Sequence, residues 1–88
     1  MNHTTIISQE ATKAIDRLDR KTERRIQSRL DELTPNPFAE RVSKPVTTFE
    51  GLRVSRVGDW RIFYIVNEAE RKIFITAVYH RGEAYRKI

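Results

Sequence analysis

The chain has 88 residues, of which 39% are hydrophobic and 33% are charged, so it fits one globular domain over residues 1–88 rather than a disordered chain. The net charge of +5 favours an acidic partner, either a nucleic acid or a protein. Cysteine is absent, which excludes disulfides and thiolate chemistry, and no stretch is apolar and long enough to span a membrane. We therefore expect a cytoplasmic protein.

The N-terminal part of the chain predicts a short strand followed by two helices. Residues 4–7 are β-prone, and Ser8 is a suitable N-cap for a helix with one apolar stripe. Asp19 can cap a second helix, which ends before Pro35 and Pro37. Helices joined this closely must form a hairpin. The second helix has basic side chains outside its apolar stripe, which we interpret first as a solvated surface: Arg20, Lys21, Arg24, Arg25 and Arg29.

The connection over residues 35–51 is expected to be ordered. Phe38 and Phe49 are its large apolar side chains, and we expect them to anchor it to the domain. A short strand is expected near residues 46–49.

A β-hairpin is predicted around Gly58 and Asp59, because β-prone runs flank this pair. If Val57 pairs with Trp60, Arg56 lies directly opposite Arg61 on the same face of the sheet. Like charges in such a pair destabilise a sheet by up to about 1 kcal/mol. This cost suggests that an anion binds between the two arginines; the alternative is that both side chains extend into water.

The C-terminal part predicts another strand and a short end segment. Residues 72–79 are apolar on both faces, which indicates a strand inside the sheet. Gly82 interrupts this strand, and a tail or helical turn follows. The expected fold class is α+β: an antiparallel sheet of three to four strands with the N-terminal helical hairpin packed on one face.

Three features occur together: the helical hairpin, the sequence Gly-Asp-Trp-Arg-Ile-Phe-Tyr at 58–64, and the sequence His-Arg-Gly-Glu-Ala-Tyr-Arg at 80–86. This combination resembles the RelE/ParE superfamily of toxin–antitoxin toxins, and the RelE branch in particular, over almost the whole chain. The resemblance implies a RelE-like, microbial RNase-like fold. It also implies a metal-independent endoribonuclease (an mRNA interferase) that needs no cofactor, cleaves messenger RNA in the ribosomal A site and inhibits translation.

The resemblance also implies the partners and the catalytic residues. The partners are a cognate RelB-like antitoxin in a hetero-oligomeric complex, messenger RNA, and ribosomal RNA, which the basic helix could contact; no membrane is involved. The catalytic positions of the family fall on Arg56, Arg61, Arg81 and Tyr85. Arginine suits the negative charge that develops when a ribose 2′-OH attacks the adjacent phosphate. Tyr85 could stack on a base or donate a hydrogen bond to the phosphate, or else pack the tail onto the sheet.

One position departs from the family pattern. RelE toxins usually have a second basic residue two positions before Arg56, where this chain has Val54. Arg53 should point to the other face unless a β-bulge redirects it. The site therefore either recruits Arg53 or has one cation fewer.

His80 is the natural candidate for proton transfer from chemistry alone, because the unperturbed pKa of histidine is near 6.5, whereas arginine is a poor acid or base. Strand alternation directs His80 away from the face of Arg81, so we expect a structural role for its ring. His3 is expected to lie in a frayed N-terminus, without a role.

Two other function classes remain open. One is a ParE-like toxin that targets DNA gyrase and cleaves no RNA. The other is a catalytically weakened homologue that binds RNA or protein, which the valine at position 54 favours. Phosphate-directed residues at three strand ends (Arg61, Arg81 and Tyr85) favour the ribonuclease over the ParE-like toxin, because a pure binding surface does not require them.

Overall fold

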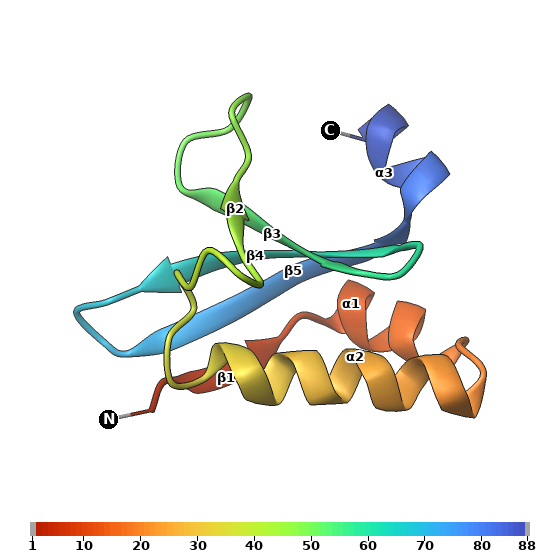
Figure 1. Ribbon diagram of the computed structural model, residues 1–88, viewed down its shortest axis with the longest axis horizontal. Coiled ribbons are helices and arrows are strands. Elements are labelled where there is room, and N and C mark those ends of the chain that lie inside the picture. The colour runs from red at the N-terminus through yellow and green to blue at the C-terminus, as the bar shows by residue number, and fades with distance from the viewer. Residues whose placement is uncertain (1, 88) are drawn as a thin grey trace.

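A five-stranded sheet lies at the centre of the computed structural model, which describes residues 2–87. Its spatial order is β1-β5-β4-β3-β2. Two helices cover one face of this sheet, and a third helix rises from the opposite face (Figure 1). The strands are β1 (Thr4–Ile7), β2 (Lys44–Pro45), β3 (Leu52–Val57), β4 (Trp60–Asn67) and β5 (Lys72–His80). The helices are α1 (Gln9–Asp16), α2 (Arg20–Leu33) and α3 (Arg81–Lys87).

The α+β class and the helical hairpin on one face are confirmed, while the sheet is larger than expected and mixed. Strand β1 lies parallel to β5, with Thr4 beside Lys72 and Ile7 beside Ile75. This pairing places β5 between β1 and β4, as its apolar faces predict. The short edge strand lies at β2 rather than at residues 46–49, which form a turn. Proline is tolerated there because β2 is an edge strand.

Both helix N-termini are capped by the predicted side chains. The Ser8 hydroxyl accepts a hydrogen bond from the Ala11 amide at 3.0 Å and donates one to the Thr76 carbonyl at 3.1 Å. The Asp19 carboxylate accepts hydrogen bonds from the Thr22 amide and hydroxyl, which lower the pKa of that carboxyl group. Capping therefore sets where each helix begins.

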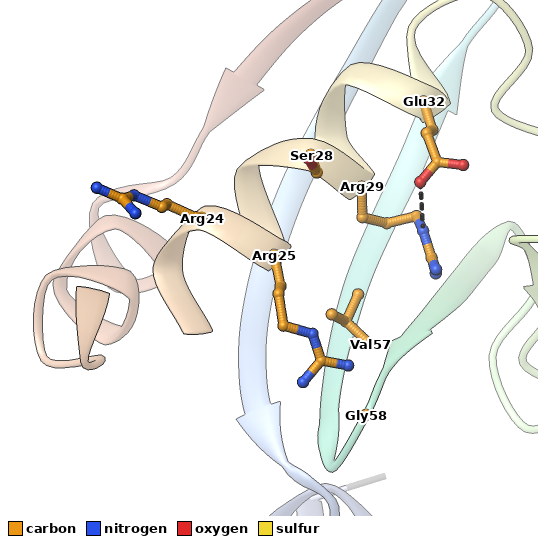
Figure 2. Close-up of a pocket in the computed structure, with 7 residues that line it drawn as sticks. All are labelled: Arg24, Arg25, Ser28, Arg29, Glu32, Val57 and Gly58. Carbon is orange, nitrogen blue, oxygen red and sulfur yellow. Dashed lines mark hydrogen bonds and ion pairs between the residues drawn. The ribbon is translucent and has the colours of Figure 1, made fainter. Parts of the chain in front are cut away.

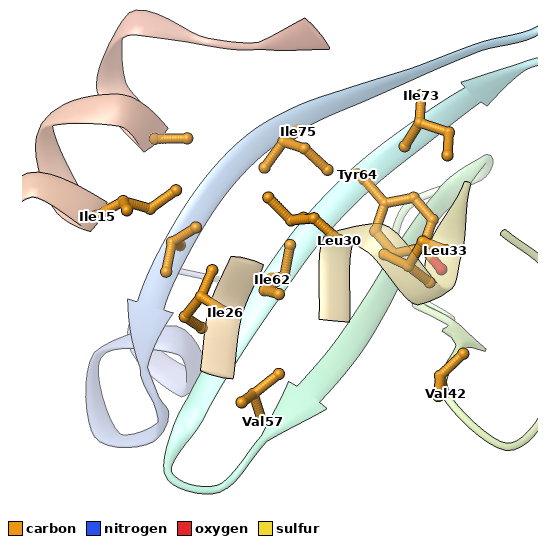
Figure 3. Close-up of a cluster of buried hydrophobic side chains, with 12 residues drawn as sticks. Ile15, Ile26, Leu30, Leu33, Val42, Val57, Ile62, Tyr64, Ile73 and Ile75 are labelled. Atoms are coloured by element: carbon orange, nitrogen blue, oxygen red, sulfur yellow. The ribbon is translucent and has the colours of Figure 1, made fainter. Parts of the chain in front are cut away.

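The main core lies between the helical hairpin and the sheet (Figure 3). Ile26, Leu30 and Leu33 recur along one side of α2, and the facing side chains of β4 and β5 are equally buried. Tyr64 is also fully buried here; its hydroxyl donates to the Pro37 carbonyl at 2.7 Å and pairs with the Ser43 hydroxyl. Burial raises the pKa of Tyr64.

The expected anchors of the connection are wrong. Phe38 and Phe49 are 41% and 50% exposed, whereas Pro37 and Val42 are buried. The smaller side chains fix the connection instead: Val42 packs in the same core as Tyr64, whose hydroxyl donates to the Pro37 carbonyl.

The prediction for His3 is also wrong, because its ring is buried. The Nδ1 atom lies 3.1 Å from the Thr34 carbonyl, and Nε2 pairs with the Glu68 carboxylate. The ring thus joins the end of α2 to the turn between β4 and β5. No helix within residues 2–87 is long and apolar enough to cross a membrane.

Candidate functional site

The β3–β4 hairpin has the predicted register. Val57 pairs with Trp60, and Arg56 lies directly opposite Arg61. Gly58 opens the turn with φ +58°, a conformation that favours glycine. The side chain of Val57, next to Arg56, packs into the core between the helices and the sheet. Because side chains alternate along a strand, Arg56 and the opposed Arg61 lie on the other face, away from α1 and α2.

An open groove of about 380 Å³ lies over these arginines, between the β2–β3 connection and α3. Arg56 and Arg61 line its strand side, and Tyr85 lines its helix side. Apolar and hydroxyl side chains complete it: Pro45, Val46, Thr47, Thr48, Val54, Phe63 and Ala84. We call this hollow the groove. Figure 1 shows its two walls, the β2–β3 connection and α3, rising from the same side of the sheet.

Arg61 is held rigidly at the groove floor. It is 6% exposed, and its Nη1 donates to the carbonyls of Gly58 and Trp60 at 2.9 Å each. Its Nε and Nη2 have no hydrogen-bond partner among the described residues. The turn carbonyls therefore fix the guanidinium while leaving donors for a ligand, which is how a preorganised anion site is built.

Arg56 and Tyr85 are the exposed partners of this fixed cation. The Arg56 side chain is exposed and makes no hydrogen bond or ion pair within residues 2–87. Tyr85 is 77% exposed, so it does not pack the tail onto the sheet. Ala84 does this instead: it is buried against Phe63 and Ala77, which fixes α3 beside the groove.

Arg81 lies at the first residue of α3, next to the hairpin turn. Its amide donates to the Asp59 carbonyl at 2.7 Å, and its Nε lies 3.9 Å from the Asp59 carboxylate. It does not line the groove. The structure thus brings Arg56, Arg61 and Tyr85 together and places Arg81 at the rim of the hairpin.

Arg53 and His80 lie away from the groove. Arg53 Nε donates to the Ser43 hydroxyl at 2.7 Å, and its guanidinium stacks over the Phe38 ring at 5.1 Å. No bulge redirects it, because β3 pairs with β4 in regular register throughout. The His80 ring packs edge-on against Trp60, which belongs to the helix-side core.

Sequence reasoning missed the hydroxyl side chains of Thr47 and Thr48 in the groove wall. Their signal was weak, because they lie in an irregular connection whose path depends on tertiary contacts. Among the residues that the structure describes, no group of three or more His, Cys, Asp and Glu side chains could hold a metal ion. Within the groove lining, the ionisable side chains are the two arginines and Tyr85.

Comparisons with known proteins agree with this architecture. The model of the family described as ParE toxin of type II toxin-antitoxin system, parDE, matches residues 5–85. No curated protein matches the sequence.

Solved structures of similar fold include toxins in complex with antitoxins. The RelE–RelB complex from Pyrococcus horikoshii is 26% identical, with a TM-score of 0.77 over 93% of this chain and 98% of that chain. The RelBE2 complex from Mycobacterium tuberculosis is 23% identical, with a TM-score of 0.79 over 92% of this chain and 100% of that chain. The RelBE complex of E. coli is 15% identical, with a TM-score of 0.78 over 89% and 95%. The chain therefore belongs to the RelE/ParE superfamily of toxins of type II toxin–antitoxin systems.

Proposed function

We propose that this toxin is a ribosome-dependent endoribonuclease that cleaves messenger RNA at the groove and thereby inhibits translation. The observation that supports this proposal is the Arg56–Arg61 pair, which lies on one open face beside the exposed Tyr85. A sheet that only needed stability would not place two cations opposite each other.

The proposed reaction is an in-line attack of a ribose 2′-oxygen on the adjacent phosphorus. The P–O5′ bond breaks, which leaves a 2′,3′-cyclic phosphate and a 5′-hydroxyl; the proton lost by the 2′-OH is balanced by the proton gained at O5′. Arg61, fixed by the turn carbonyls, and the exposed Arg56 stabilise the extra charge on the phosphate oxygens. Tyr85 stacks on a base or donates its hydroxyl to the phosphate. Arg81 supplies further positive charge from the rim.

A ParE-like toxin that targets DNA gyrase is the second candidate. Two observations favour it: the matching family model is that of ParE toxins, and Arg53 faces Ser43 rather than replacing the missing cation at Val54. The two activities require different experiments with the same purified protein.

The deciding measurement combines translating ribosomes and gyrase. The ribonuclease predicts new messenger RNA 5′ ends, mapped by primer extension, that require ribosomes and disappear when Arg61 is replaced by leucine. The ParE-like alternative predicts linearised plasmid with gyrase and intact messenger RNA. Cleaved plasmid together with intact RNA would reject the first proposal in favour of the second.

We also propose a RelB-like antitoxin as the cognate partner. An apolar row crosses the sheet on its groove side, from Ile6 through Phe74 and Ile65 to Leu52, which are neighbours in the strand register. Ile6 and Ile65 are 39% and 44% exposed, and a contiguous exposed apolar surface favours binding of a protein. The net charge of +5 adds attraction for an acidic chain.

Hydrogen exchange tests this partner. If a small acidic protein is encoded beside the toxin, mixing the two should protect amides in β1 and β4 from exchange. The rate of association should fall with added salt, because ions screen the attraction between opposite charges. If no segment of the sheet or helices gained protection, that neighbour would not be the antitoxin.

A further inference from the structure

The groove continues into two further basic hollows. At the free end of β3, a hollow of about 110 Å³ is lined by Arg56 of the groove and by Arg29, Arg41 and Lys44. Next to it, a hollow of about 310 Å³ between α2 and the hairpin turn is lined by the same Arg29 and by Arg24 and Arg25 (Figure 2). Arg56 and Arg29 thus each belong to two hollows. We call the two outer hollows together with these shared arginines the basic track.

The edge of β3 allows this continuity. Strand β2 pairs only with Val54 and Arg53, so no strand covers the edge of β3 from Ser55 to Val57. Arg29 reaches this uncovered edge instead, where its Nη1 donates to the Arg56 carbonyl at 2.6 Å and to the Ser55 hydroxyl at 2.9 Å. A cation therefore occupies the point where the surface passes from one side of the sheet to the other.

Glu32 and Glu40 are the acidic side chains that line the two outer hollows, and they leave most of the positive charge uncompensated. Glu32 is shared between Arg29 and Arg41, at 3.3 and 2.9 Å. The guanidinium groups of Arg24 and Arg25 have no hydrogen bond or ion pair with any residue that the structure describes. The basic track thus has arginine donors available for an anionic ligand.

Arg25 is the outer end of this path. Figure 2 shows its guanidinium directed at the turn around Gly58, while Arg24 points away from that turn. A Cβ atom at position 58 would lie 3.0 Å from Arg25 Nη2, so the absence of a side chain at Gly58 leaves room for this guanidinium. The turn glycine therefore serves both the hairpin and the position of Arg25.

The lining of the basic track fits a phosphate backbone better than a protein. Val57 is the apolar side chain of the α2 hollow, whereas the centres of protein interfaces are rich in apolar and poor in charged groups. Interfaces with nucleic acids are more polar and more positively charged, and the guanidinium fork matches phosphate oxygens.

We propose that the basic track binds the phosphates of the same RNA strand that occupies the groove, as this strand passes round the free end of β3 and onto α2. This inference rests on the proposed function in one respect, because it takes RNA as the occupant of the groove. It extends that function by assigning phosphate contacts to Arg25, Arg29 and Arg41, outside the reacting site.

The experiment measures fluorescence anisotropy with 2′-O-methyl RNA, which cannot undergo attack by the 2′-oxygen. One probe has about ten nucleotides, within the usual range of single-strand sites. The other is a dinucleotide that fills the groove alone. Arg25→Gln should weaken binding of the long probe about fivefold at ~0.1 M salt and reduce its salt slope by about 0.7, the values expected for one lost phosphate contact. The dinucleotide should bind both proteins equally.

The controls separate this contact from general charge. Lys13→Gln removes the same charge from α1, outside all three hollows, and should leave both probes unaffected. Arg25→Lys should keep most of the salt slope. Circular dichroism and thermal melting verify that each variant is folded.

Three results would overturn the proposal. The first is an unchanged affinity of Arg25→Gln for the long probe, and the second is an equal loss with Lys13→Gln. The third is a loss confined to association with ribosomes or with the acidic antitoxin, which would assign the basic track to ribosomal RNA or to the protein partner. The probes cannot be cleaved, so this binding test is independent of ribonuclease activity. A protein without ribonuclease activity can still bind the long probe less tightly after Arg25→Gln, and an active ribonuclease can still bind it unchanged.

Discussion

Replacing Arg56 by glutamine should increase stability and strongly reduce activity. Arg56 lies opposite Arg61, and its side chain makes no compensating contact with any described residue. The one hydrogen bond at this residue uses its main-chain carbonyl, which the substitution retains. The variant therefore removes a repulsion without removing a stabilising interaction.

The size of the gain follows from the geometry. Like charges in directly opposed positions destabilise a sheet by about 0.2–1 kcal/mol, and the exposure of Arg56 favours the lower half of this range. In a domain of this size about 1 kcal/mol shifts Tm by roughly 4–8 °C. We therefore expect Tm to rise by about 1–4 °C, and the rise to shrink at high salt because ions screen the repulsion.

Cleavage should respond in the opposite direction. Loss of one group that stabilises the transition-state charge typically lowers the rate about 10²–10³-fold, measured here as messenger RNA cleaved per toxin on translating ribosomes. Lys13→Gln is the charge-matched control; Lys13 lies in the last turn of α1, so its loss should leave cleavage intact and leave Tm unchanged or slightly lower. A lower Tm with normal cleavage in Arg56→Gln would show that the arginine pair is structural, and the reasoning would fail.

Three further predictions concern stability. Arg81→Ala should change the free energy of unfolding by no more than about 1 kcal/mol while reducing cleavage, because its pair with Asp59 is 61% exposed at the arginine; a large drop in Tm would make Arg81 structural. Gly58→Ala should lower the free energy of unfolding by about 1–2 kcal/mol in urea titrations, since φ +58° strains an L-residue. Gly58→Asn should lower it less, because asparagine adopts this left-handed conformation more readily. Equal stability of the two variants would contradict this. Burial raises the pKa of Tyr64 above the unfolded value of 10.0, so the stability that its protonated form contributes is complete below pH 10 and is lost as the pH rises further. Above pH 10, Tm should therefore fall less steeply in Tyr64→Phe than in the parent protein. Parallel curves of Tm against pH would refute this assignment.

Local chemistry in the sequence determined the elements of this protein. Ser8 and Asp19 cap the helices because their side-chain oxygens reach amides three residues away. The glycine at position 58 sets the hairpin register, and register alone places Arg56 opposite Arg61. Each of these interactions spans a few residues, so a single sequence suffices to predict it.

Contacts between distant segments decided the rest. The parallel pairing of β1 with β5 joins residues almost seventy positions apart, and the burial of His3 depends on Glu68 in the same way. Nothing near either position in the sequence signals its partner, because parallel strands can be joined only through an intervening connection.

The candidate site likewise combines features that local sequence predicts with features that depend on tertiary contacts. Alternation along β3 and β4 predicted which face Arg56 and Arg61 share, and strand continuity predicted that Arg53 faces the other way. The path of the β2–β3 connection, the docking of α3 through Ala84 and the meeting of α2 with the hairpin turn required the folded chain. These features are set by how side chains fill space between elements, which alternation and capping along a single segment do not specify.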